Sequence, residues 1–276
     1  MSLTQINSNI PGLNSLRALN RINRKLSTHQ TRLSTGKKIN STEEDPAGFA
    51  LATGLERRVR GLDVARQNVN NAQNILNVAE GGYQNQLDIL QTVKEKATQA
   101  ADYSLSTSQR TAIHEQVSAL LNEIDSIEDE TTFNGSNLID GNYDGYFQTG
   151  EGANDNLHVK LSRSDSTSIG SVNISGIDLK TTNGASTAIN TVSSAIDSLA
   201  ESLQTIGQYK ARLSAKENTL SVASTNTEAV RSSVEDADFA KEQMEVMKLQ
   251  IMQQTAVSSF TQANSSGQVV LSIVGR

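Results

Sequence analysis

The chain has no cysteine and no tryptophan, and only two of its 276 residues are proline. The lack of cysteine excludes disulfides and thiol chemistry. The scarcity of proline allows long helices to run without interruption. Phe and Tyr number five each and 36% of the residues are hydrophobic, which is little for a round globular core. These absences favour an elongated, mainly helical body.

The sequence also lacks long apolar runs and a basic overall charge. No run of about 18 apolar residues is present, so no membrane insertion is expected. The N-terminal stretch "MSLTQINSNIPGLNSL" has neither a basic start nor a continuous apolar core, so we expect no cleavable secretory signal. The net charge of −6 argues against a nucleic-acid-binding protein, which would be basic overall.

The charge is unevenly distributed along the chain. Residues 1–42 carry seven Lys or Arg and no acid, whereas residues 107–151 carry nine acids and one base. The basic N-terminal segment is therefore expected to face an acidic partner segment, for which the chain's own C-terminal part is one candidate.

No constellation for catalysis or metal binding stands out. The three histidines are scattered, and "HEQVS" at 114–118 lacks the second His of the zinc-protease motif because Ser118 stands in its place. A catalytic zinc site needs about three protein ligands. No phosphate-binding glycine loop and no Ser-His-Asp set is recognisable. We therefore expect no enzyme, no metal and no cofactor.

Apolar residues recur at spacings of three and four, the pattern of amphipathic helices. The pattern predicts helices at 3–33, 46–101, 107–128 and 188–230, and a last helix near the C-terminus. Pro11 and Gly12 interrupt the first helix near its start, and Gly36 is expected to end it. Asp45 followed by Pro46 predicts the start of the second helix. Ser233 and Asp236 have the spacing of a capping box for the last one.

Two stripes have the period of a coiled coil. One runs from Leu51 to Leu90, 39 residues in eleven steps, and Gly81-Gly82 predicts a local defect in it. The other keeps a heptad from Ile189 to Leu220, broken only by Lys210 and Glu217. Residues 131–187 instead alternate apolar and polar residues in "YFQTG", "LHVKLS" and "SVNISGIDL", as short strands do. The predicted fold is mainly α: a long-helix coiled-coil bundle with a small antiparallel β-hairpin patch and paired N- and C-terminal helices.

The first helix and the last helix cannot bury all of their apolar surface against each other. A lone pair of amphipathic helices leaves its outer faces wet, and isolated helices are marginal in water. We expect the tails to be frayed in a single molecule and to order on assembly with other copies. The predicted assembly residues are Ile6, Ile10, Leu13, Leu16, Leu19, Leu26, Leu33, Met244, Met247, Ile251, Phe260 and Val270. An association surface not closed by rotation gives an open helical polymer.

A cluster of arginines in "LERRVRGLDVAR" has two readings. Arg57, Arg58, Arg60 and Arg66 could form a nucleic-acid patch, but the acidic net charge and few aromatics favour ion pairs with acidic faces of neighbouring copies. The candidate acidic partners are Glu128, Asp129 and Glu130.

Four stretches resemble bacterial flagellins, the subunits of the flagellar filament. "RLSTGKKINSTEEDPAGFALATGLERRVRGL" at 32–62 resembles the N-terminal signature, and the segment from Arg231 to Val274 is similar to the C-terminal one. "LLNEIDSIEDETTFNG" and "GANDNLHVKL" resemble the β-hairpin region between them. The resemblance implies a secreted structural protein that polymerises into the filament for swimming. It also implies an export apparatus of the type III kind, a chaperone, a filament cap and hook-associated proteins as partners.

The resemblance further implies a layered subunit. Residues 1–44 plus 235–276 would form an inner coiled-coil tube domain, and 45–234 a helical rod domain that carries the β patch. Only about fifty residues separate "FNG" from the last heptad stripe, so a minimal form without an outer domain is expected.

Many flagellins are recognised by an animal innate receptor, Toll-like receptor 5, through the first rod helix. Recognised members carry Arg, Leu and Glu where this sequence has Thr92, Lys96 and Gln116. These departures predict a poor agonist.

Three other readings stay open at this point. A hook–filament junction protein has flagellin-like termini. A secreted enzyme or adhesin with such ends would need a longer central insertion than 131–187, and a coiled-coil binding module would stay monomeric.

Overall fold

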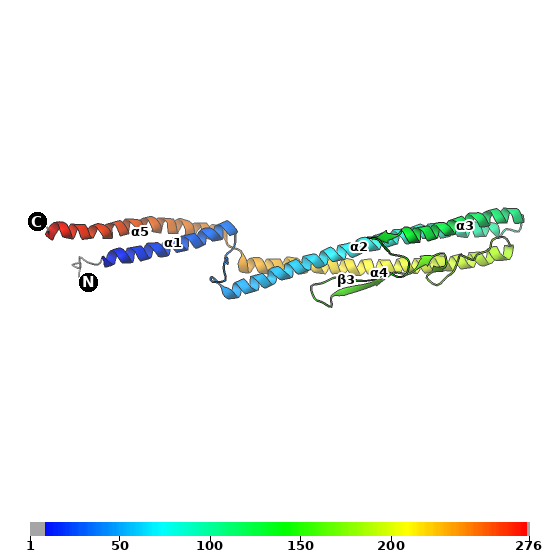
Figure 1. The fold of residues 1–276 in the computed structure, drawn as a ribbon, viewed down its shortest axis with the longest axis horizontal. Helices are drawn as coiled ribbons and strands as arrows, with labels where there is room; N and C mark the ends of the chain where they lie inside the picture. The colour runs from blue at the N-terminus through cyan, green and yellow to red at the C-terminus, as the bar shows by residue number, and fades with distance from the viewer. Residues whose placement is uncertain (1–8, 275–276) are drawn as a thin grey trace. The chain divides into compact units, whose positions relative to one another are not determined.

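The computed structural model describes the backbone of residues 9–274 and the side chains of residues 9–265. Within them lie the helices α1 (Ile10–Thr35), α2 (Pro46–Ala100), α3 (Thr107–Glu130), α4 (Thr182–Glu235) and α5 (Phe239–Val274), shown in Figure 1. The chain divides into two compact units. Unit 1 comprises Met1–Arg57 and Asn226–Arg276, and unit 2 comprises Arg58–Thr225. The mainly α class is confirmed, whereas the assignment of either unit to a filament layer stays a prediction.

Local side chains set the ends of α1 and the start of α2. The Asn9 side chain accepts a hydrogen bond from the Gly12 backbone N–H at 2.9 Å, and Gly36 ends α1 with a φ of 72°. Pro11 lies in the first turn, where no intrahelical donor is needed, so α1 begins at the predicted interruption, and the part of the predicted helix before residue 9 lies outside the described residues. The Asp45 carboxylate accepts from the Gly48 N–H at 3.0 Å and caps α2, as predicted.

The predicted capping box at Ser233 and Asp236 is wrong. Helix α4 continues to Glu235, and the Ser233 hydroxyl donates to the Val230 carbonyl at 2.7 Å instead. Asp238 caps α5, because its carboxylate accepts from the N–H groups of Ala240 and Lys241 at 2.9 and 3.1 Å. Two candidate caps occur within six residues here, and spacing alone cannot choose between them.

Unit 2 is a bundle in which α2, α3 and α4 share one core. On α4 the buried seam repeats every seven residues, at Val192, Leu199, Ile206, Leu213 and Leu220. The predicted companion positions Ile189, Ile196 and Leu203 are only half-buried, because the smaller residues Ala188, Ala195 and Ser202 occupy that side of the seam. The Lys210 ammonium pairs with the Glu80 carboxylate at 2.6 Å.

Helix α2 passes through Gly81-Gly82 without a break, so the predicted defect there is wrong. A Cβ atom on Gly82 would lie 2.6 Å from the Thr131 hydroxyl and 3.2 Å from a methyl of Ile139. Gly82 therefore allows the chain after α3 to approach α2 closely, whereas a Cβ on Gly81 would meet nothing within 4 Å.

The segment between α3 and α4 holds three antiparallel two-stranded sheets, which confirms the small β patch. They pair β1 (Thr132–Phe133) with β2 (Ser136–Asn137), β3 (Asp144–Gln148) with β4 (Asn156–Lys160), and β5 (Ser164–Asp165) with β6 (Ser168–Ile169). The strand predicted in "SVNISGIDL" is absent apart from one isolated bridge, between Ile169 and Val172. Ile174 and Leu179 of that stretch are instead buried in the core as irregular chain.

Candidate assembly surface

Helices α1 and α5 lie side by side and antiparallel in unit 1 (Figure 1). The Asn9 amide donates to the Ala263 carbonyl at 3.1 Å, and the Gln253 amide donates to the Asn23 side-chain oxygen at 2.8 Å. At the other end a β-bridge joins Lys37 and Asp236. The predicted pairing of the N- and C-terminal helices is thus confirmed within one molecule.

The apolar seam of this pair is thin. Leu26 of α1 packs with Val246 and Leu249 of α5, and Ile22 and Leu33 lie partly buried against them. No other buried apolar cluster joins the two helices among the residues whose side chains the structure describes.

The predicted stripe on α5 faces away from α1. Met244, Met247 and Ile251 are 60%, 48% and 64% exposed. At about 100° per residue, Met244 lies about 200° around the helix from Val246, as do Met247 and Ile251 from Leu249. Helix α1 therefore covers a different face of α5 from the one that carries Met244, Met247 and Ile251.

The N-terminal half of α1 is similarly uncovered. Ile10, Leu13 and Leu16 are exposed, whereas Leu19 is half-buried. Phe260 is half-buried as well. The predicted assembly residues Ile6 and Val270 lie outside the side chains that the structure describes.

A buried acid ties the two helices together electrostatically. Glu242 of α5 is buried, with one carboxylate oxygen against the His29 ring and the other 3.6 Å from the Arg32 guanidinium. Lys37 pairs with Glu235 at 2.5 Å. A buried carboxylate needs such partners because its desolvation is otherwise costly. The basic N-terminal segment thus meets acids of the C-terminal part between His29 and Lys37, as the uneven distribution of charge along the sequence predicted.

The arginines predicted to contact other copies are partly engaged within their own chain. The Arg58 guanidinium pairs with Glu151 at 3.1 Å, and that of Arg66 lies 3.7 Å from Asp63. Arg57 and Arg60 are exposed. Their role between copies stays a prediction.

The three acids at the end of α3 do not form one surface. Glu128 is buried, while Asp129 and Glu130 are exposed. Burial is the main cause that raises the pKa of Glu128, and the neighbouring charges of Asp129 and Asp165 raise it further against the opposing effect of Arg163.

The receptor-related residues lie on α2 and α3. Thr92 is half-buried, and its hydroxyl donates to the Asp88 carbonyl one turn earlier at 3.1 Å. Lys96 is half-buried and Gln116 is exposed.

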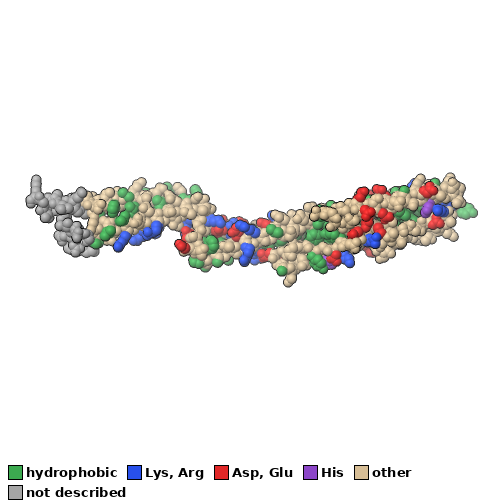
Figure 2. Space-filling model, viewed as in Figure 1, with side chains coloured by type: hydrophobic (Ala, Val, Ile, Leu, Met, Phe, Trp, Pro, Cys, Tyr) green, Lys and Arg blue, Asp and Glu red, His purple; other side chains and the backbone are tan. Residues whose placement is uncertain are grey.

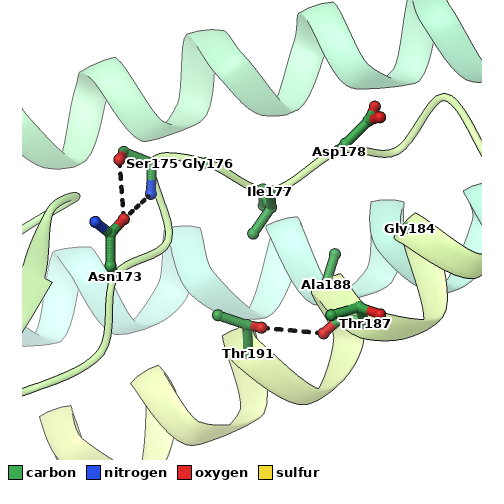
Figure 3. Close-up of a pocket in the computed structure, with 9 residues that line it drawn as sticks. All are labelled: Asn173, Ser175, Gly176, Ile177, Asp178, Gly184, Thr187, Ala188 and Thr191. Carbon is green, nitrogen blue, oxygen red and sulfur yellow. Dashed lines mark hydrogen bonds between the residues drawn. The ribbon is translucent and has the colours of Figure 1, made fainter.

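Nothing in unit 2 resembles a catalytic centre. One hollow, of about 440 Å³, is an open groove between the loop 173–178 and the start of α4 (Figure 3). Its side chains are small or uncharged except Asp178, and Ser175 donates to Asn173 inside the loop. Among the residues described, no three His, Asp or Glu side chains gather as metal ligands, and no helix is long and apolar enough to span a bilayer.

Comparison with known proteins gives consistent matches over nearly all of the chain. Residues 6–144 match the family model of the bacterial flagellin N-terminal helical region, and residues 189–274 match that of the C-terminal helical region. The flagellin of Bacillus subtilis (strain 168) is 30% identical over 98% of this chain and 99% of its own. Flagellin FlaB1 of Treponema pallidum is 29% identical over the same shares. A solved structure from Vibrio parahaemolyticus, assigned to the flagellar hook-associated proteins, covers 70% of this chain with a TM-score of 0.59 at 14% identity, which is a likeness of fold alone.

Proposed function

Since the chain belongs to the bacterial flagellin family and is a structural subunit of the extracellular flagellar filament, we propose that the α1–α5 pair is the surface through which copies polymerise. The outward stripe of α5, made of Met244, Met247 and Ile251, and the exposed apolar residues of α1 would bury against the same helices of other copies.

The exposure of that stripe carries the proposal. Three large apolar side chains on one face, about half or more exposed, are unusual on a helix that stays in water. The few buried apolar residues of the pair all lie in the seam between α1 and α5. The outward stripe can therefore be buried only against other copies.

We propose that folding and assembly of unit 1 are coupled. Fully burying one Leu, Ile or Met side chain contributes roughly 1.5–3 kcal/mol. A seam with three buried apolar side chains offsets only a small part of the conformational entropy that two long helices lose when they become ordered. The pair would therefore open readily in a dilute molecule and become rigid when its outward faces are covered.

The test is a truncation that removes residues 240–276, compared with the full chain. The truncated protein should stay soluble and helical, because the core of unit 2 is intact, but should not polymerise when seeded with filament fragments. Circular dichroism and sedimentation measure the two properties. Filaments of ordinary appearance from the truncated chain would refute the proposal.

The finer partners belong to this proposal as well. Export through a type III apparatus with a chaperone that covers the tails would suit a subunit whose ends are incomplete alone. A filament cap and hook-associated proteins would present the surfaces on which the first and last copies order. The full-length flagellin relatives favour the filament subunit over the hook–filament junction reading, because the hook-associated structure shares the fold alone.

We further propose that Toll-like receptor 5 responds weakly to this flagellin. Thr92, Lys96 and Gln116 differ from the residues of recognised members in size or charge. A receptor-reporter assay should show a weak response, and the triple change Thr92→Arg, Lys96→Leu and Gln116→Glu should strengthen it. A full response by the unchanged protein would contradict the expectation.

A further inference from the structure

We infer that a basic stripe on α1 sets the axial register between neighbouring copies by pairing with an acidic band near the start of α5 in the next copy. The stripe consists of Arg17, Arg21, Arg24 and Lys25, and the band is centred on Asp236 and Glu245. The inference rests on the proposed polymerisation and adds to it which charges meet and at what stagger.

The stripe lies on the side of α1 that faces away from α5. All four side chains are exposed, and at about 100° per residue they fall within an arc of about 100° around the helix. At about 100° per residue, Arg17, Arg21 and Arg24 lie about 140–200° around the helix from the buried Leu26. Lys and Arg side chains gather along one edge of the α1–α5 pair in Figure 2.

The stripe has no acidic counterpart at its own level in unit 1. Residues 1–42 contain no acid, and neither do residues 246–276. The contacts Asn9–Ala263, Asn23–Gln253 and Lys37–Asp236 show that a residue n of α1 lies level with a residue near 273 − n. The stripe is therefore level with residues near 248–256, where the charged side chain is Lys248, another cation.

The acids of the C-terminal part lie at a different level. Glu235, Asp236, Asp238, Glu242 and Glu245 are level with residues near 28–38, the end of α1 and the turn that follows it. Glu235 and Glu242 are buried and already paired inside the molecule, and Asp238 caps α5. Asp236 is exposed. The half-buried Glu245 accepts hydrogen bonds from the Lys248 ammonium at 3.3 Å on both carboxylate oxygens, but this is a surface pair within one helix, of a kind that contributes little to stability. These two acids are therefore placed to accept cations from outside.

The offset between the stripe and the band gives a stagger. Along the helix axis, Glu245 and Asp236 lie about 7 and 16 residues from the level of Arg21. At 1.5 Å per residue this axial offset is roughly 10–25 Å. Two parallel copies displaced by this amount bring opposite charges together, whereas unshifted copies place four cations beside four cations. Because stripe and band are different surfaces, the contact is head-to-tail and repeats from copy to copy, as an open helical polymer requires.

The test reverses each side separately and then both together. The basic-side variant is Arg21→Glu with Arg24→Glu, the acidic-side variant is Asp236→Lys with Glu245→Lys, and the swapped variant carries all four changes. Lys94→Glu with Lys180→Glu is the control, since both lysines are exposed in unit 2 and the net charge changes as in the basic-side variant. Seeded polymerisation is followed by sedimentation, and helicity and melting of each monomer by circular dichroism.

The basic-side variant should raise the concentration needed for polymerisation roughly 10- to 100-fold at low salt, because several attractions become repulsions. The control should resemble the unchanged chain, and the swapped variant should recover polymerisation. Since the swapped groups are not in contact within one molecule, recovery can come only from contact between copies. The defect of the basic-side variant should shrink near 1 M salt, where screening acts over about 3 Å.

Two results would overturn the register. One is a basic-side variant that polymerises like the unchanged chain at low salt. The other is a swapped variant that keeps normal helicity and melting but stays monomeric or stops at dimers. Failure of the unchanged chain to polymerise from seeds would instead refute the proposed function itself, so the two failures are distinguishable.

Discussion

Two neighbouring apolar residues of α5 should respond in opposite ways to the same kind of truncation. Leu249 is buried against α1, whereas Ile251 is 64% exposed on the outward face. We expect Leu249→Ala to weaken the α1–α5 pair inside one molecule. We expect Ile251→Ala to leave the single molecule unchanged and to weaken polymerisation.

The magnitudes follow from the area that each side chain hides. Truncating a buried Leu typically costs about 2–5 kcal/mol, and the thin seam places the loss of Leu249→Ala near the low end, about 2 kcal/mol. A surface truncation changes the stability of a monomer by about 0.5 kcal/mol or less. If the exposed 64% of Ile251 becomes covered in the filament, its removal costs about 1–2 kcal/mol per copy. That corresponds to a roughly 5- to 30-fold rise in the critical concentration.

Amide hydrogen exchange of the monomer and sedimentation of seeded samples separate the two effects. Leu249→Ala should speed exchange along α1 and α5, because that exchange reports local opening of the pair. Ile251→Ala should exchange like the unchanged monomer and still require the higher concentration to polymerise. An Ile251→Ala protein that polymerises normally, or that loosens the monomer as much as Leu249→Ala does, would refute the assignment of faces.

Three further predictions concern the fold. Gly82→Ala should lower the free energy of unfolding by about 1–3 kcal/mol, because its Cβ would lie 2.6 Å from Thr131. Gly81→Ala should raise the free energy of unfolding by about 1 kcal/mol, and thermal melts compare the two variants. Burial raises the pKa of Glu128, so its charged form destabilises unit 2 as pH rises through that pKa. Glu128→Gln should therefore raise the melting temperature at neutral pH, with the gain fading under acidic conditions, and an unchanged melt would contradict this. Asp238→Ala removes the N-cap of α5 and should destabilise the start of that helix by about 1 kcal/mol. Amide exchange should become faster in the first turn of α5 alone.

Local chemistry predicted most of the helices and their ends. Gly36 and Asp45 act where expected because a left-handed cap and an N-cap depend on a few adjacent residues. The cap of α5 was assigned to the wrong residues because "SSVEDAD" offers rival hydroxyls and carboxylates, and tertiary packing extends α4 past the first of them.

Periodicity predicted the stripes but not the side on which each is covered. On α4 the heptad has the right period, yet alanines and a serine fill half the seam, because close packing there favours small side chains over large ones. At Gly82 the sequence predicts a weak point in the helix. In the structure the absence of a side chain there allows Thr131 to pack closely against α2. A single sequence does not show which residues pack against each other. It therefore cannot distinguish a glycine that weakens a helix from one that allows another segment to pack closely.

The terminal helices show why this distinction matters for function. Two apolar stripes run along α5, and the sequence gives more prominence to the one with Met244, Met247 and Ile251. Because α1 takes the other stripe, with Val246 and Leu249, the prominent one stays uncovered in a single molecule. Had α1 covered the prominent stripe instead, Val246 and Leu249 would lie on the outward face, and contacts between copies would have to form there. The assignment of faces, rather than the presence of helices, is therefore what links this sequence to a filament.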